Sequence, residues 1–179
     1  TFAMAAYWLA KLRNGDVPLM ERALRLSERA SDRERLLIRA GWADMTDDPS
    51  RLATAESLTT RYPAELEGYL WLGHAQKWVG DFPAAVASLK RVIRMDSASL
   101  AIDMRGTGAP MRCLACEATV EISSVYHMMD SLPAAEREIK GWIRKQPRSI
   151  SAWGNLEQLY VFWNHFDEAA AASRTLSTI

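Results

Sequence analysis

The chain has 179 residues, the size of one domain or of one elongated repeat array. Its 22 Lys and Arg residues balance its 22 Asp and Glu residues, which argues against a nucleic-acid-binding protein with a wholly basic surface. No run approaches the roughly 18 apolar residues of a membrane-spanning helix. The 27 Ala and 19 Leu residues far outnumber the 7 Val and 8 Ile residues. Because Ala and Leu favour helices and β-branched residues favour strands, the composition predicts an all-helical protein.

The first third of the chain predicts two pairs of helices. The first pair is expected near 2–13 and 17–30, and the second near 33–46 and 49–61. In the turn of the second pair, Asp48 is expected to cap the following helix and Pro49 to be its first residue. The chain opens directly in a helical pattern without features of a signal peptide. We therefore interpret it as a segment of a longer protein whose localisation is unknown, with the cytoplasm favoured.

Three later segments, 66–99, 116–149 and 150–179, carry the same residue types at the same offsets, which indicates an internal repeat. The last two abut at a period of 34 residues, and an insertion, 100–115, separates the first from the second. The fourth position is aromatic or Thr (Tyr69, Thr119, Trp153), and the seventh is aliphatic (Leu72, Ile122, Leu156). The seventeenth position is bulky (Phe82, Leu132, Phe166), and the twentieth is Ala (Ala85, Ala135, Ala169).

This pattern resembles the tetratricopeptide repeat (TPR), a helix-turn-helix unit of about 34 residues. The resemblance implies an all-α, right-handed superhelix in one domain spanning 1–179. About five hairpins are expected, with repeats near 1–31, 32–65, 66–99, 116–149 and 150–179. Small residues in such a unit let its two helices approach closely, and stacked hairpins share one continuous core.

A finer resemblance is to the TPR tails of large bacterial signalling and regulatory proteins, such as serine/threonine kinases, adenylate cyclases and winged-helix regulators. The stretch 27–38, followed by the repeat junction at Pro63, carries it. It implies a non-catalytic scaffold for protein–protein interaction. No kinase or cyclase motif occurs in the sequence, so no enzymatic activity is carried over.

In a TPR unit the first helix lines the concave face of the array, through positions 2, 5, 9, 12 and 13 of the repeat. The resemblance therefore implies a mixed polar and apolar groove that binds a peptide or a partner domain. Its alternatives are a face covered by another part of the parent protein, or a small-molecule sensor with an enclosed aromatic pocket. The candidate groove residues are Glu67, Leu70, His74, Lys77, Trp78, Glu117, Ser124, His127, Met128, Gln158 and Phe162.

The expected partner is a protein or peptide, including another domain of the parent protein, and a homo-oligomer is left open. A chaperone C-terminal carboxylate is disfavoured, because Lys77 alone makes a weak clamp. The Arg-rich stretch 22–39 is interleaved with acidic residues and is interpreted as a solvated helical face with i,i+4 ion pairs. We expect no nucleic-acid binding through this segment, no membrane insertion, no cofactor and no metal.

Cys113 and Cys116 are the only two cysteines. We expect both thiols in the first turn of the helix after the insertion, packed as small apolar groups. A local disulfide is the next interpretation. A zinc site ranks last, since zinc needs further ligands and His127 is the only nearby candidate. The spacing is also compatible with an enzyme or thiol-redox unit, which is the third functional hypothesis, although a redox pair is expected near a βαβ pattern that this chain lacks.

Overall fold

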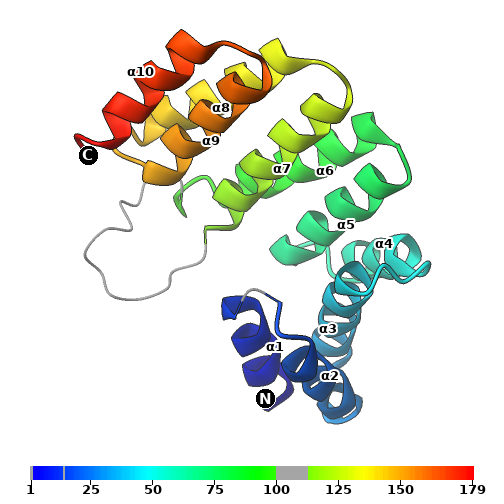
Figure 1. Ribbon diagram of the computed structural model, residues 1–179. Helices are drawn as coiled ribbons and strands as arrows, with labels where there is room; N and C mark the ends of the chain where they lie inside the picture. Colours follow the sequence, from blue (N-terminus) through cyan, green and yellow to red (C-terminus); the bar gives the residue numbers. More distant parts are fainter. Residues whose placement is uncertain (1, 14, 100–112) are drawn as a thin grey trace. The chain divides into compact units, whose positions relative to one another are not determined.

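The computed structural model describes residues 2–13, 15–99 and 113–179 (Figure 1). These residues form ten α-helices and one short 3-10 helix, and none of them lies in a strand. Most of the predicted insertion, residues 100–112, lies outside the described residues. The helices are α1 Phe2–Leu12, α2 Val17–Leu26, η1 Ser27–Arg29, α3 Asp32–Met45, α4 Arg51–Arg61, α5 Leu66–Trp78, α6 Phe82–Met95, α7 Leu114–Met128, α8 Leu132–Lys145, α9 Ile150–Phe162 and α10 Phe166–Leu176.

The turns after α5, α7 and α9 have one geometry. The fifteenth residue of each repeat has a left-handed backbone, with φ of 81° at Gly80, 52° at Asp130 and 61° at Asn164. Gly, Asn and Asp are the residue types that tolerate this conformation best. The next N–H then bonds to a carbonyl five residues earlier, as in Ser131 to Tyr126 at 2.8 Å, the arrangement of a Schellman motif. These three turns thus share one backbone geometry at the same offset along the chain.

The described chain divides into two compact units, residues 1–84 and 85–179. In the first unit, α1 packs against α2, α3 packs against α4, and α5 packs against α3 and α4. Its core includes the fully buried side chains of Tyr7, Met20, Ile38 and Leu58. Each hairpin leaves an apolar stripe that only a neighbouring helix can cover, which is why the pairs stack.

In the second unit, α7 packs against α8, α9 packs against α10, and α8 also packs against α9. One apolar cluster joins the buried Ala135 and Ile139 to Leu156 and Tyr160. Ala135 is fully buried, as expected for a position where two helices approach closely. No described helix of either unit is both long and apolar enough to cross a membrane.

Two predicted helix boundaries are wrong. Helix α4 begins at Arg51, because the Asp48 carboxylate accepts the Ser50 N–H at 2.7 Å and holds Pro49 in the turn. The helix expected to extend to residue 30 ends as an α-helix at Leu26 and continues as η1. The next helix starts soon afterwards, at a capping box formed by Ser31 and Glu34.

Candidate functional site

The second unit contains a cleft of about 310 Å³ between α7 and α9, the first helices of two successive hairpins. Each helix contributes four residues at the spacing i, i+3, i+4 and i+7, which places them on one helical face. The lining residues are Val120, Ser123, Ser124 and His127 on α7, and Asn155, Gln158, Leu159 and Phe162 on α9.

One end of the cleft is aromatic. The His127 and Phe162 rings lie 5.1 Å apart between centroids, and Phe162 is 59% exposed. Leu159 is buried and lines the same cleft as the amide side chain of Asn155 and the hydroxyl of Ser124. None of the described lining residues is Lys, Arg, Asp or Glu. The cleft therefore offers an apolar surface beside neutral hydrogen-bonding groups, a combination that suits polypeptide backbone and an apolar side chain.

In the first unit, side chains of α1 cover part of α5, the first helix of the repeat 66–99. Tyr7 Oη and Lys11 Nζ on α1 both donate to Glu67 Oε1 on α5, at 2.9 and 2.5 Å. Trp71 Nε1 donates to Tyr7 Oη at 3.2 Å, and Lys11 Nζ lies 3.9 Å from the centroid of the Trp71 ring. Glu67 is 2% exposed. Because a buried carboxylate is stabilised only when it is paired, this network explains how Glu67 is tolerated inside the unit.

No family model matches the chain, and no curated protein matches it either. Several solved structures do. The TPR protein TTC0263 of Thermus thermophilus aligns with a TM-score of 0.67 at 21% identity, over 97% of this chain and 88% of that one. MamA aligns with a TM-score of 0.61 at 17% identity, over 92% and 86%. The TPR-like repeats of a Podospora anserina kinesin light chain homologue align with a TM-score of 0.58 at 13% identity, over 99% and 90%.

The chain has a TPR fold. The all-α, TPR-like architecture expected from the sequence is confirmed by these similarities together with the ten helices of the described residues. At identities of 21% or less, they show the fold alone.

Four of the predicted groove residues lie together in the cleft, namely Ser124, His127, Gln158 and Phe162. Met128 and Glu117 lie on α7 but do not line it; Met128 is 50% exposed. The prediction that Glu67 and Leu70 line the groove is corrected. Both residues are buried, so neither presents its side chain to a partner. Tyr7 and Lys11 cover Glu67, and Leu70 is an apolar residue on a helix that packs against α3 and α4.

The other three predicted residues belong to the first unit. His74 Nδ1 lies 3.3 Å from the Asp44 carboxylate, and the side chains of both are largely buried. Trp78 is 60% exposed, with the Lys77 ammonium 5.9 Å and the Arg51 guanidinium 5.4 Å from its ring. Trp78 is thus a solvent-facing aromatic side chain flanked by cations within its own unit.

The sequence interpretation missed Ser123, Asn155 and Leu159, which also line the cleft. On α9 the lining face is shifted by one residue from that on α7: it uses repeat positions 6, 9, 10 and 13, whereas α7 uses positions 5, 8, 9 and 12. The shift arises because the two helices face each other from opposite sides. The polar residues Asn155 at position 6 and Ser123 at position 8 could have indicated these faces. They are overlooked when one set of groove positions is used for every repeat.

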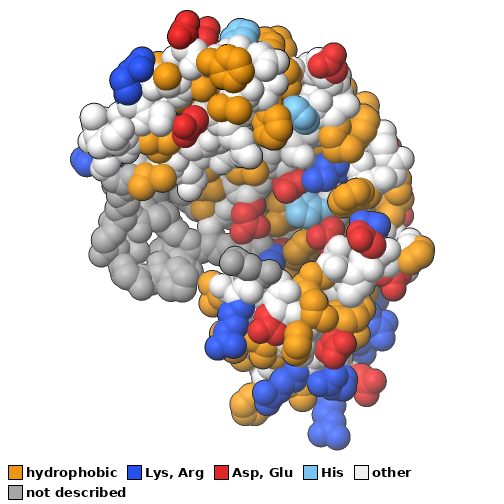
Figure 2. Space-filling view, viewed as in Figure 1, with side chains coloured by type: hydrophobic (Ala, Val, Ile, Leu, Met, Phe, Trp, Pro, Cys, Tyr) orange, Lys and Arg blue, Asp and Glu red, His pale blue; other side chains and the backbone are white. Residues whose placement is uncertain are grey.

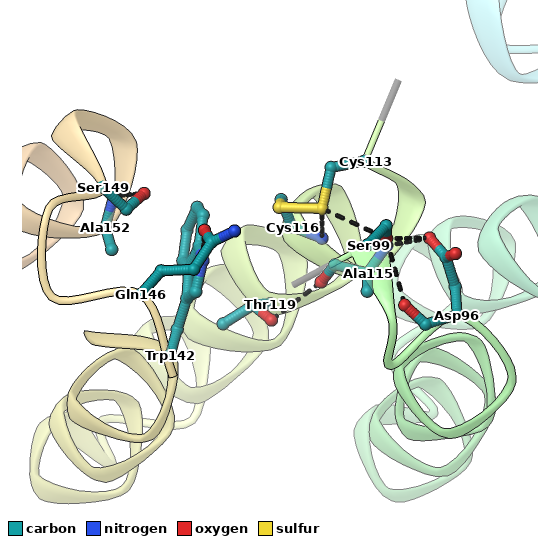
Figure 3. The surroundings of a disulfide bond; sticks show 10 residues. All are labelled: Asp96, Ser99, Cys113, Ala115, Cys116, Thr119, Trp142, Gln146, Ser149 and Ala152. Atoms are coloured by element: carbon teal, nitrogen blue, oxygen red, sulfur yellow. Dashed lines mark hydrogen bonds between the residues drawn. A yellow bond between two sulfur atoms is a disulfide. The ribbon is translucent and has the colours of Figure 1, made fainter. Parts of the chain in front are cut away.

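The expectation of two free thiols is wrong, because Cys113 and Cys116 form a disulfide (Figure 3). Their predicted location is right: Cys113 is the N-cap of α7, and Cys116 lies in its first turn. Both sulfurs pack beside the buried cluster of Ala115, Trp142 and Ala152. Within the described ranges, no group of three or more His, Cys, Asp and Glu residues could hold a metal ion.

The arginines of the stretch 22–39 are exposed or partly exposed, and some of them are paired. Arg25 lies 3.7 Å from Glu21, an i,i+4 pair, and Arg33 lies 2.6 Å from Glu65 on a different segment. Figure 2 shows basic, acidic and apolar side chains interspersed on the face it presents. The Arg25–Glu21 pair is an i,i+4 ion pair of the kind expected for this stretch.

Carboxylates outside the cleft have lowered pKa values. Hydrogen bonds from Lys140 Nζ at 2.6 Å and from Tyr160 Oη at 2.7 Å hold the pKa of Glu136 below its ordinary value. In the first unit, the Tyr62 hydroxyl lowers the pKa of Asp32 most, with Arg35 and Arg61 adding to the effect. Each network joins residues from more than one helical segment. None of these charged residues lines the cleft.

Proposed function

We propose that the chain is a non-catalytic protein-interaction module that binds a peptide segment of its partner in the cleft between α7 and α9. The observation that carries this proposal is the pairing of exposed aromatic rings, His127 and Phe162, with amide and hydroxyl groups on the same two helices. Exposed aromatic anchors beside neutral polar groups are typical of peptide-binding surfaces. The TPR fold supports the same role, since TPR arrays serve mainly as binding surfaces.

The lining defines the chemistry of the peptide. An apolar side chain of the peptide would pack against Phe162 and Leu159. The N–H and C=O groups of the peptide backbone would form hydrogen bonds with the side chains of Asn155, Gln158 and Ser124. The described lining has no charged side chain, so a neutral segment fits it better than a strongly acidic or basic one. A carboxylate clamp is again disfavoured.

We further propose that the two units continue one TPR array and that this array belongs to a larger bacterial signalling or transcription-regulatory protein. The stretch 27–38 and the common repeat register support this assignment. In that setting the partner is either a separate protein or another domain of the same polypeptide.

The alternative, a small-molecule sensor, would be favoured by an enclosed pocket lined by Trp78, His127 and Phe162. Only the last two line the cleft, and Trp78 belongs to the other unit. Phe162 is 59% exposed, so the cleft surrounds its contents far less than a ligand pocket does. An open cleft favours a peptide.

The test is selection from a random library of displayed peptides of about 12 residues, followed by affinity measurements on the enriched sequences. We expect enrichment of neutral segments with an apolar anchor. Phe162→Ala should weaken the binding of these peptides by a factor of about 10 or more, the effect of removing an aromatic anchor.

Phe166→Ala is the matched control, because Phe166 is 62% exposed on α10 and does not line the cleft. It should leave affinity unchanged, and both variants should keep the helicity of the parent protein. Equal losses in the two variants, or a library that yields no binding sequence, would contradict the proposed site.

A further inference from the structure

The Cys113–Cys116 bridge is set in an environment that distinguishes its two sulfurs. Cys113 is the N-cap of the 15-residue helix α7, and its sulfur accepts the Cys116 N–H at 3.0 Å. The Ser99 hydroxyl lies 3.5 Å from the same sulfur. The helix N-terminus and the hydrogen bond donated by the Cys116 N–H stabilise a negative charge, so they favour a thiolate at Cys113. The Ser99 hydroxyl donates its proton to the Asp96 carboxylate, whose negative charge acts in the opposite direction.

The side of the bridge that faces Cys116 holds the Trp142 ring and the Gln146 amide (Figure 3). Ser99 and Asp96 lie on the Cys113 side. Trp142 is buried and packs with both cysteines in one apolar cluster. Because both cysteines share this packing, Cys113 is distinguished by its place at the N-cap of α7 and by the Cys116 N–H that its sulfur accepts.

The disulfide is accessible to solvent, and hydrogen bonds hold the surrounding backbone in place. Both cysteines are partly exposed. The Asp96 carboxylate accepts the Ala115 N–H at 3.2 Å and the Ser99 hydroxyl, which ties the start of α7 to the end of α6. This support does not depend on the disulfide. A bridge between residues three positions apart closes a very short loop, so it adds little chain-entropy stabilisation.

From these contacts we propose that Cys113 and Cys116 form a reversible thiol–disulfide exchange site, with Cys113 as the attacking thiolate. The co-substrate is a low-molecular-weight disulfide such as oxidised glutathione, and in the reverse direction the matching thiol. The site lies at the opposite end of α7 from His127, and this proposal does not depend on peptide binding in the cleft.

The exchange balances in two steps. The Cys113 thiolate bonds to one sulfur of the small disulfide, whose S–S bond breaks and whose other half leaves as a thiolate and takes a proton. The Cys116 thiol then loses its proton to solvent and attacks Cys113 Sγ. The Cys113–Cys116 bond forms, and the second small thiol leaves. One small disulfide is reduced to two thiols as the protein dithiol is oxidised.

The first experiment counts thiols in the native protein equilibrated in glutathione redox buffers and then alkylated and weighed by mass spectrometry. We expect two alkylated cysteines in reducing buffer and none in oxidising buffer, with helicity retained in both. A bridge that opens only after denaturation, or thiols that stay free in oxidising buffer, would overturn the proposal.

The second experiment compares single-cysteine variants at neutral pH. Cys113 in Cys116→Ser should react with iodoacetamide about 10-fold faster than Cys116 in Cys113→Ser, and only Cys113 should form a mixed disulfide readily with oxidised glutathione. The reference thiol is Ser173→Cys, placed in the last turn of α10 in a variant with both native cysteines changed to Ser. Equal rates at Cys113 and at this reference thiol would show that α7 does not activate Cys113.

Discussion

The residue at the second position of a TPR repeat is buried in one unit and partly exposed in the other. In the first unit, Glu67 is buried beneath Tyr7 and Lys11, and the network is closed by Trp71. In the second unit, Glu117 at the same repeat position is only partly buried, and the neighbouring face of α7 borders a cleft. One repeat position thus serves packing in one unit and lies beside a candidate binding surface in the other.

The difference teaches that repeat register identifies a helical face, while neighbouring helices decide whether that face is available. Helix α1 supplies Tyr7 and Lys11 to α5, and these long side chains fill the space above Glu67. Between α7 and α9, small and medium polar side chains such as Ser123 and Asn155 leave space unfilled. Side-chain size across the gap therefore separates a packed face from a cleft.

The largest expected effect tests the closed face. Glu67→Ala leaves the Lys11 ammonium, whose side chain is 13% exposed, without its carboxylate. Removing one partner of a buried ion pair typically costs about 3–5 kcal/mol, and we expect a loss of about 3 kcal/mol because Lys11 can still reach water. Urea denaturation measures the total loss, and hydrogen exchange should locate it in residues 2–84.

Glu117→Ala is the matched control, since it removes the same residue at the same repeat position of the second unit. It should cost less than about 1 kcal/mol, the contribution of a partly exposed carboxylate in the first turn of a helix. Comparable losses in the two variants would mean that the burial of Glu67 contributes nothing specific, and the contrast between the units would fail.

The second prediction uses one substitution at two glycines. A Cβ at Gly41 would lie 2.8 Å from Tyr7 Cε2 and 3.2 Å from Tyr7 Oη, whereas a Cβ at Gly154 would meet no atom within 4 Å. The Tyr7 ring is held by Glu67 and Trp71, so it cannot move aside without losing hydrogen bonds. Gly41→Ala should therefore destabilise the protein by about 1–2 kcal/mol despite the better helix propensity of Ala.

Gly154→Ala should instead stabilise the protein by about 0.5–1 kcal/mol, because Ala restricts the unfolded chain and favours α9. Thermal unfolding of the two variants beside the parent protein makes the comparison. If both substitutions shift the midpoint in the same direction, the space around Gly41 and around Gly154 does not differ in the way the geometry indicates.

Much of the fold follows from local pattern. The period of 34 residues in the last two repeats, together with Gly80, Asp130 and Asn164 at one repeat position, predicts where the first helices end. The helix expected near 33–46 is found at Asp32–Met45. These features depend on residues within one or two turns of each other, so a single sequence contains them.

The state of particular side chains depends on distant residues. Glu67 is buried by Tyr7, 60 residues earlier, and nothing near Glu67 in the sequence indicates that contact. The cleft residue Asn155 was missed because which side of α9 faces α7 is a property of packing. The CxxC spacing alone is compatible with both free thiols and a bridge, and the choice depends on how α7 begins.

The smallest expected effect concerns a carboxylate at the surface of the second unit. The folded pKa of Glu136 lies below its ordinary value near 4.5, chiefly because of the hydrogen bond from Lys140 and then that from Tyr160. A lowered folded pKa contributes stability at pH values above the unfolded pKa, and the contribution is lost as pH falls through the folded pKa. Its size should be less than about 1 kcal/mol, as for other solvent-accessible pairs.

Glu136→Gln should therefore be slightly less stable than the parent protein at pH 7, and the difference should disappear at pH values below the folded pKa of Glu136. Urea denaturation across pH 2–7 measures this, with Glu157→Gln as the control, since the described residues offer Glu157 no ion-pair partner. A difference that persists at the lowest pH would assign the effect to packing. In that case the buried ion pair of Glu67 would be the remaining carboxylate whose contribution to stability distinguishes one unit from the other.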